Sequence, residues 1–188
     1  MAYTKTILCL AASRKHGGYC IAGKDIKTGE WIRPVSSRPD EEISNNECTM
    51  RNGTQATLLD IIEIPLLREI PSSYQSENHL IDPSGKWMKK GEGTWKKAKE
   101  SIDDHSGPLW LNQDASFGYL NNRVNASAVA KLDNSLMLTD PIIEHRFLAG
   151  ADRIENLTGA VLCVSLGEIY RGHAYKLVAA VIEPPRGR

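Results

Sequence analysis

The segment from Thr57 to Leu67 constrains the fold most, because it is apolar on both of the faces that a β-strand presents. Side chains two positions apart share a face of a strand. The apolar side chains divide between the two faces as Leu58, Ile62, Ile64 and Leu66 on one and Leu59, Ile61 and Leu67 on the other. Such a strand must be covered on both sides, as it is in a barrel or between layers. Pro65 cannot donate a ladder hydrogen bond, so we expect the pairing to stop or bulge there.

Three more strands are predicted upstream, as a meander between residues 4 and 39. Apolar runs of strand length lie at 6–12, 19–26 and 30–35, and the two turns between them both contain glycine. Glycine adopts backbone angles that other residues avoid, so these glycines mark turns between paired strands. We therefore expect three consecutive antiparallel strands.

The second half of the chain predicts two further strands and little helix. Residues 160–166 and 174–182 are apolar runs joined by a hairpin loop with two glycines. The longest helix is expected near Thr94 to Asp104, because Thr94 can cap its first turn and an apolar stripe follows at helical spacing. The expected fold class is mainly β, an OB-like β-barrel with a few short helices.

The composition is that of an ordinary globular protein. The 188 residues can form one domain or two small ones of roughly 90 residues each. A formal net charge of zero argues against avid, non-sequence-specific binding of duplex DNA, which needs many basic residues facing phosphates. No apolar run approaches the roughly 20 residues that span a bilayer, and the N-terminus lacks a signal-peptide pattern. We predict a cytoplasmic protein that does not contact a membrane.

The cysteines show no metal-binding pattern. The four of them are scattered through the chain without a C-x-x-C pair: Cys9, Cys20, Cys48 and Cys163. No cysteine and histidine stand at the spacing of zinc ligands. We therefore expect free thiols, no structural metal and no cofactor.

A basic stretch with an aromatic residue makes the meander a candidate binding surface. Residues 14 to 38 hold six basic and two acidic side chains, which leaves a local charge of +4 in a neutral chain. A stacking surface beside a cation suits a nucleotide or single-stranded nucleic acid. The ligand contacts predicted here are Ser13, Arg14, Lys15, Trp31, Arg33 and Arg38. The alternative, which is the more common one for such a run of charge, is a solvated basic face with a core tryptophan.

A polar segment from Pro71 to Asp82 is the second candidate. Its side chains offer several hydrogen-bond donors and acceptors within a short reach. The ligand contacts predicted here are Tyr74, Gln75, Glu77 and Asn78. An exposed edge strand or loop is the alternative interpretation. Arg123 is added from a long polar loop at 112–125, because loops of that length in compact domains are often functional.

Six segments resemble the prokaryotic dual OB domain proteins. They are Cys9–Lys15, Cys20–Gly23, Trp31–Ser36, Leu58–Leu66, Tyr74–Asp82 and Leu162–Glu168. The resemblance covers most of the chain and implies two OB-like β-barrels with a nucleic-acid or nucleotide-binding role. Members of that family carry further strands between the segments similar to Ser135–Leu138 and Thr139–Arg146. Here these two segments abut, which implies that the second barrel is shortened or absent.

We interpret the chain as three regions. Residues 1–92 are predicted to form an N-terminal OB-like barrel, and residues 93–134 a mostly helical and loop insertion. Residues 135–188 are predicted to supply C-terminal strands that complete a shortened second barrel or pack on the first. The predicted function is binding of nucleic acid or a nucleotide, with a single-stranded or phosphate-containing ligand.

Two other functions are carried as alternatives. The first is a small-nucleotide sensor in which Ser13–Gly18 forms an anion nest. This segment lacks the P-loop spacing, so ATPase chemistry is unsupported. The second is a metal-dependent nuclease that would assemble Asp60, Glu77, His79 and Asp82. No spacing enforces that assembly, and we predict a binding protein rather than an enzyme.

Arg33 carries the sharpest expectation. Ile32 should point into the barrel and Arg33 outward, and Pro34 should end regular pairing. A guanidinium can hold a phosphate in bidentate fashion, which a lysine ammonium cannot, so Arg33→Lys should weaken ligand binding. If Arg33 instead pairs with a buried acid such as Asp60 or Glu42, the same change should lower stability and leave affinity intact.

Overall fold

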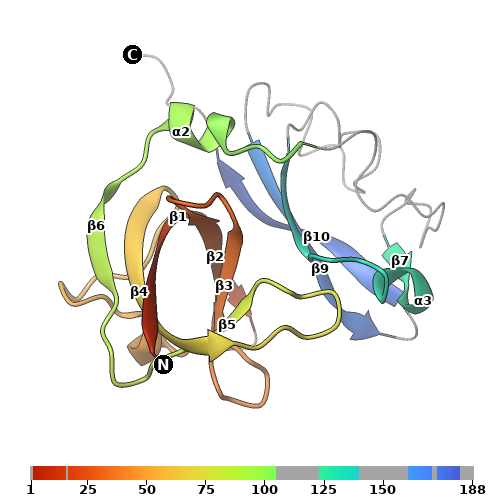
Figure 1. The fold of residues 1–188 in the computed structure, drawn as a ribbon, viewed down its shortest axis with the longest axis horizontal. Helices are drawn as coiled ribbons and strands as arrows, with labels where there is room; N and C mark the ends of the chain where they lie inside the picture. Colours follow the sequence, from red (N-terminus) through yellow and green to blue (C-terminus); the bar gives the residue numbers. More distant parts are fainter. Residues whose placement is uncertain (1, 16, 105–122, 140–160, 171–172, 183–188) are drawn as a thin grey trace.

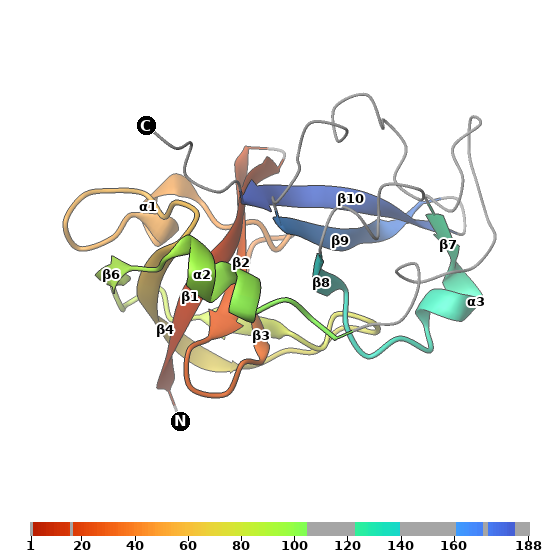
Figure 2. The ribbon, with the colours of Figure 1, turned by 90° about the horizontal axis from the view of Figure 1, so that it is seen from above.

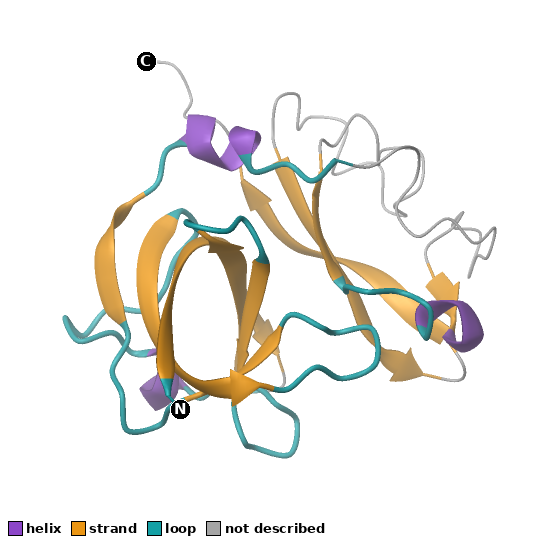
Figure 3. Cartoon of the chain, viewed as in Figure 1, coloured by secondary structure: helices purple, strands orange, loops and turns teal. Residues whose placement is uncertain are grey.

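The computed structural model describes residues 2–15, 17–104, 123–139, 161–170 and 173–182, which fold mainly into β-strands (Figure 1, Figure 3). The strands are β1 (Tyr3–Lys15), β2 (Gly18–Asp25), β3 (Trp31–Val35), β4 (Asp60–Glu69), β5 (Asn78–Ile81), β6 (Met88–Glu92), β7 (Arg123–Asn125), β8 (Leu136–Thr139), β9 (Val161–Tyr170) and β10 (His173–Ile182). The helices in the same segments are α1 (Asn45–Cys48), α2 (Trp95–Glu100) and α3 (Ala126–Val129). The predicted fold class, mainly β with short helices, is confirmed.

Strands β1 to β5 close into a barrel. The predicted meander is present, since β1 pairs with β2 and β2 with β3, both antiparallel. β3 then pairs in parallel with β5, β5 pairs with β4, and β4 returns to β1. This cycle is visible as a ring in Figure 1. β6 extends the sheet by pairing with β4.

The length of β1 and a bulge within it allow the barrel to close. Its first part, Tyr3–Leu8, pairs with β4, and from Ile7 onward it pairs with β2. The register shifts between Cys9 and Ala11. A bulge bends a strand and increases its twist, so one strand can serve two neighbours on either side of the ring.

Apolar side chains from every strand of the ring fill the barrel interior. The buried set includes Ile7, Ile21, Ile32, Ile62, Ile64, Leu66 and Ile81. Helix α1 lies between β3 and β4 in the chain and adds Cys48 to the same cluster. A capping box between Ser44 and Glu47 satisfies the free backbone donors at the start of α1. This short helix is therefore held at one end of the barrel by both packing and its cap.

A second, antiparallel sheet in the order β7-β10-β9-β8 packs on the outside of the barrel. It contains the predicted C-terminal hairpin as β9 and β10. Figure 2 shows β9 and β10 running beside the end of β1 and β2. The contact is an apolar cluster that includes Leu8, Leu10 and Ala22 from the barrel and Leu136, Leu138 and Cys163 from the second sheet. Among the described residues, no pairing closes this sheet into a second barrel.

β4 and the segment leading into it are covered on both sides, as the sequence predicted. Ile62 and Ile64 point into the barrel, while Leu59 and Ile61 lie against the apolar cluster outside it. This double burial is the reason that the segment lacks an alternation of apolar and polar residues.

Pairing does not stop at Pro65, which was one of the two outcomes expected, because β4 continues through it. It stays in register opposite Thr4, and its carbonyl accepts a hydrogen bond from the amide of Asp82 at 3.0 Å. The irregularity falls slightly later, between Leu66 and Arg68 in the pairing with β5. Proline removes one donor only, so a strand can pass through it where the acceptor is still used.

The longest helix of the described segments is α2, where it was predicted. The hydroxyl of Thr94 accepts a hydrogen bond from the amide of Lys97 at 3.2 Å, which confirms the predicted N-cap. Residues 112–122 of the predicted long loop lie outside the described residues. In the segments that the structure describes, no helix has the length and apolar character needed to cross a membrane.

Candidate functional site

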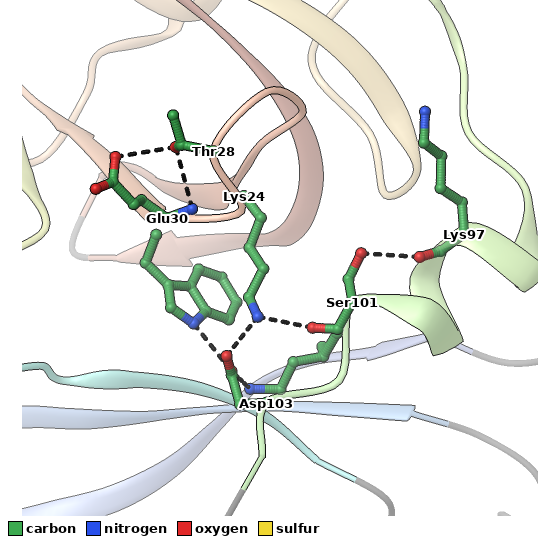
Figure 4. A network of polar contacts seen from close by, with 8 residues as sticks. Lys24, Thr28, Glu30, Lys97, Ser101 and Asp103 are labelled. Carbon is green, nitrogen blue, oxygen red and sulfur yellow. Dashed lines mark hydrogen bonds and ion pairs between the residues drawn. The ribbon is translucent and has the colours of Figure 1, made fainter.

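The outer face of β3 does not face solvent freely. Trp31 is half-buried, and its indole Nε1 donates a hydrogen bond to Asp103 at 3.0 Å. The ammonium of Lys24 lies 5.4 Å from the centroid of the Trp31 ring and forms an ion pair with the same carboxylate. Figure 4 shows Lys24 and Asp103 meeting beside Ser101, whose carbonyl accepts from Lys24 at 2.7 Å. The stacking surface, the Trp31 ring, and the cation, Lys24, are both present, but both are bound to Asp103 in the segment that follows α2.

Arg33 projects outward from β3 into a buried polar network. Its Nε donates to Oδ1 of Asn78 at 2.6 Å and its Nη1 to the hydroxyl of Ser135 at 3.4 Å. The same hydroxyl is hydrogen-bonded to the carboxylate of Glu77. Arg33 is 9% exposed and Glu77 is 4% exposed. The network therefore ties β3 and β5 to the residue that precedes β8.

The surroundings of Arg33 match the expected direction of its side chain but not its expected partners. Ile32 points into the barrel as predicted. The acids considered from sequence have other partners, since Asp60 pairs with Lys89 and Glu42 with Arg38. Pro34 does not end the strand, because β3 continues its pairing with β5 through Val35.

The polar segment before β5 contacts the second half of the chain. Tyr74 is buried in an apolar cluster with Val124, Val129 and Ala174. The hydroxyl of Ser76 donates to the carbonyl of Asp133. Tyr74, Glu77 and Asn78 thus lie at the contact between the barrel and the second half of the chain, and Gln75 accepts from Asn78. Arg123 lies on β7, opposite Tyr175 of β10.

Arg14 and Arg38, two exposed arginines of the prediction, lie at another place, the end of the barrel at the β1–β2 turn. Ser13, Arg14 and Lys15 lie opposite Cys20, Tyr19 and Gly18 in the β1–β2 register. The exposed guanidinium of Arg14 lies 5.8 Å from the centroid of the Tyr19 ring. The phenol hydroxyl of Tyr19 donates to Asn45 of α1 at 3.2 Å. The ring is therefore held at one end by α1 and covered on one side by a cation.

Arg38 reaches the same end of the barrel from the loop after β3. Tyr19 and Ile43 form an isolated antiparallel bridge, with backbone hydrogen bonds of 2.7 and 3.0 Å. Glu42, the neighbour of Ile43, pairs with Arg38 at 3.2 Å. We refer to Arg14, Tyr19, Arg38 and Glu42, together with Gly18, as the turn-end cluster. The Tyr19 ring, with Arg14 over it, lies on the Ile43 side of β2, and the Arg38–Glu42 pair lies on the Gly18 side, both at the same end of the strand.

Glu42 is unusual within the turn-end cluster. It is 8% exposed, and its Oε2 has no hydrogen-bond partner among the residues that the structure describes, whereas Oε1 is held by Arg38. Its carboxyl carbon lies 3.1 Å from the position that a Cβ on Gly18 would take. The backbone of Gly18 can approach this closely because glycine has no side chain. A buried acceptor without a donor costs free energy, about 1–3 kcal/mol for a typical polar group.

A small pocket of about 220 Å³ lies between the β2–β3 turn and α2. Leu8, Ile26 and Ile102 contribute apolar surface, and Lys24 and Lys97 are among its charged lining residues. Figure 4 shows the Lys24 ammonium at Ser101, whereas the Lys97 side chain points away and only its carbonyl accepts from the Ser101 hydroxyl. Lys24 forms an ion pair with Asp103, and Asp25 and Glu100 also line the pocket, so the charges around it are mixed.

The four residues of the nuclease alternative are not brought together. Glu77 bonds Ser135, His79 bonds the hydroxyl of Tyr3 at 2.6 Å, and Asp82 accepts from Ser84 in a turn. Burial lowers the pKa of His79, which favours its neutral form. Within the part of the chain that the structure describes, no three His, Cys, Asp or Glu side chains form a group that could hold a metal ion.

The closed ring of five strands, with α1 between β3 and β4, defines an OB-type β-barrel protein. The family model described as "Dual OB-containing domain" matches residues 5–139 and 136–181. The chain therefore belongs to that family, which confirms the resemblance. The two matched segments meet at 136–139, where the resemblance places missing strands. Comparisons with curated proteins and with solved structures give no significant match.

Sequence reasoning missed Tyr19, Glu42 and Asp103. Tyr19 could have been found, because the antiparallel pairing of β1 with β2 across a short glycine-containing link places it directly opposite Arg14. Glu42 and Asp103 carry no local signal. Their importance depends on Arg38 and Lys24, whose side chains reach them only in the folded chain.

Proposed function

We propose that the protein binds single-stranded nucleic acid or a nucleotide at the turn-end cluster. The observation that carries the proposal is the exposed guanidinium of Arg14 over the Tyr19 ring, with Arg38 held by Glu42 in the loop that bridges to Tyr19. An aromatic ring next to arginines can hold a base by stacking and a phosphate by charge-assisted hydrogen bonds. The family membership supports the same class of ligand, since OB barrels are a frequent scaffold for oligonucleotide binding.

The proposal divides the predicted residues into two groups. Arg14 and Arg38 would contact phosphate, and Ser13 and Lys15 adjoin them on β1. The other group would hold the two sheets together and so keep the barrel in place: Trp31, Arg33, Tyr74, Gln75, Glu77, Asn78 and Arg123. Direct ligand contact by members of this second group stays a prediction.

Fluorescence anisotropy with a labelled thymidine oligomer tests the proposal. Arg14→Ala and Arg38→Ala should each weaken binding roughly 5- to 30-fold, the equivalent of about 1–2 kcal/mol for a charge-assisted contact. Two or three phosphate contacts to a single strand also predict a shallow salt dependence, with a log–log slope of about −1.5 to −2.

Arg68→Ala is the matched control. Arg68 is an exposed arginine near the end of β4, next to the N-terminal part of β1, whereas Arg14 lies near the other end of β1. Its loss removes the same charge without touching the turn-end cluster. Equal weakening by Arg68→Ala and Arg14→Ala, or no binding of any oligomer or nucleotide by the wild type, would refute the proposal.

A further inference from the structure

The unpartnered oxygen of Glu42 indicates what kind of base the turn-end cluster would accept. The carboxylate is more than nine-tenths buried, one oxygen is bound to Arg38, and the other has no donor within the described part of the chain. The residue before it, Glu41, has a positive φ of 56°, which is unfavourable for a side chain other than glycine. The chain thus accepts a backbone cost and a desolvation cost to hold this acceptor next to Arg38.

We infer that Glu42 makes the turn-end cluster selective for guanine, an inference that rests on the nucleotide binding proposed above and adds the identity of the base. Guanine presents two adjacent donors, N1–H and the N2 amino group, which suit a carboxylate acceptor. Its O6 stands beside N1 and is an acceptor, which suits the guanidinium of Arg38. The Glu42–Arg38 pair therefore presents an acceptor beside a donor, in the order that matches the donors and the acceptor on this edge of guanine.

The other bases fit this pair less well. Adenine and cytosine each place a ring-nitrogen acceptor next to their amino group, and that acceptor would face the carboxylate. Uracil and thymine have one N–H flanked by two carbonyl oxygens. A site with a buried polar group rejects ligands that leave this group unpaired. The same argument gives inosine, which lacks the N2 amino group, an intermediate rank.

Arg38 holds one oxygen of Glu42 from an exposed loop. The Arg38 side chain is 44% exposed, and residues 37–41 of its loop are all exposed. The Glu42 carboxylate otherwise lies against the backbone of Gly18, which cannot swing aside. A guanine that takes over the Arg38 contact through O6 keeps the guanidinium paired, so the exchange leaves no charge without a partner.

The test compares thymidine oligomers of equal length that carry two central guanines, inosines, adenines or only thymidines, by competition anisotropy. The wild type should bind in the order guanine, inosine, adenine, with about a tenfold difference between guanine and adenine, equivalent to one lost hydrogen bond. Glu42→Gln should bring guanine to within about twofold of adenine and leave the all-thymidine oligomer unchanged. Glu41→Gln, the exposed neighbour, should keep the guanine preference.

The outcomes separate this inference from the proposed function. Binding that needs Arg14 and Arg38 but shows no preference for guanine overturns the role of Glu42 and leaves the proposed function in place. A guanine preference that survives Glu42→Gln also overturns it. The ranking of guanine, inosine and adenine in the wild type needs no variant, so its absence overturns the inference even if Glu42→Gln does not fold.

Discussion

Replacing Arg33 by lysine should destabilise the protein, because Arg33 joins the barrel to the second sheet. Its Nε is the donor for Oδ1 of Asn78, a residue with 0% exposure, and lysine has no group at that position. The contact to Ser135 is longer, at 3.4 Å, and should contribute less. An ammonium on a flexible stem can reach one of these acceptors but not both.

The size of the effect follows from what is left unpaired. Losing a hydrogen bond from a charged donor costs about 1.5–3 kcal/mol, and stranding a buried amide oxygen costs a similar amount. The two estimates describe the same bond, so we expect a loss of about 2–3 kcal/mol in the free energy of unfolding. For a chain of this size, that corresponds to a fall of roughly 5–10 °C in Tm.

Urea unfolding and oligomer binding should be measured on Arg33→Lys together. Arg38→Lys is the matched control for stability, because its exposed ion pair with Glu42 should contribute at most about 1 kcal/mol. We expect Arg33→Lys to lose stability and to keep its affinity at temperatures where it is folded. Unchanged stability with weaker binding would refute the structural role and favour direct contact between Arg33 and the ligand.

Two further predictions concern acid stability and the β1–β2 turn. Burial acts to raise the pKa of Asp60, but hydrogen bonds from Lys89 and Thr57 outweigh it and lower this pKa below its usual value. The stability that this carboxylate contributes is therefore complete above the unfolded-state pKa of about 4 and is lost as the pH falls through the lower folded-state pKa. Urea unfolding at pH values between these two pKa values should show a weaker pH dependence in Asp60→Asn than in the wild type. An unchanged pH dependence in the variant would contradict this role of Asp60. Gly18→Ala should lower the free energy of unfolding by about 1–3 kcal/mol, because its Cβ would lie 2.7 Å from the carbonyl oxygen of Ile43. An unchanged Tm by circular dichroism would show that the bridge between Tyr19 and Ile43 yields at little cost.

The fold was more predictable than the candidate site because its signals are local. The meander followed from apolar runs separated by turns, and the antiparallel pairing of β1, β2 and β3 agrees with it. The parallel pairing of β3 with β5 had no local signal. This pairing depends on how the chain returns after β4, and the only indication of it in the sequence was the family resemblance.

The candidate residues illustrate why exposure is hard to infer from sequence. Arg14 and Arg33 are both arginines on strands of the same basic stretch. Arg14 is exposed beside the Tyr19 ring, whereas Arg33 is buried against Asn78. The difference arises because the second sheet covers the outer face of β1 to β3 at one place and not at the other.

The sequence by itself determined the class of fold, through a strand apolar on both faces and the glycine turns that set the meander. It also determined the local partners of these turns, such as Arg14 and Tyr19, because pairing across a short turn follows from the chain. Only the tertiary structure decided which polar side chains are buried. Arg33 and Ser135 are 102 positions apart, so their hydrogen bond depends on packing between the two sheets and not on any nearby residue. The same packing leaves the turn-end cluster, with its unpartnered Glu42 oxygen, as the surface on which ligand binding can be tested.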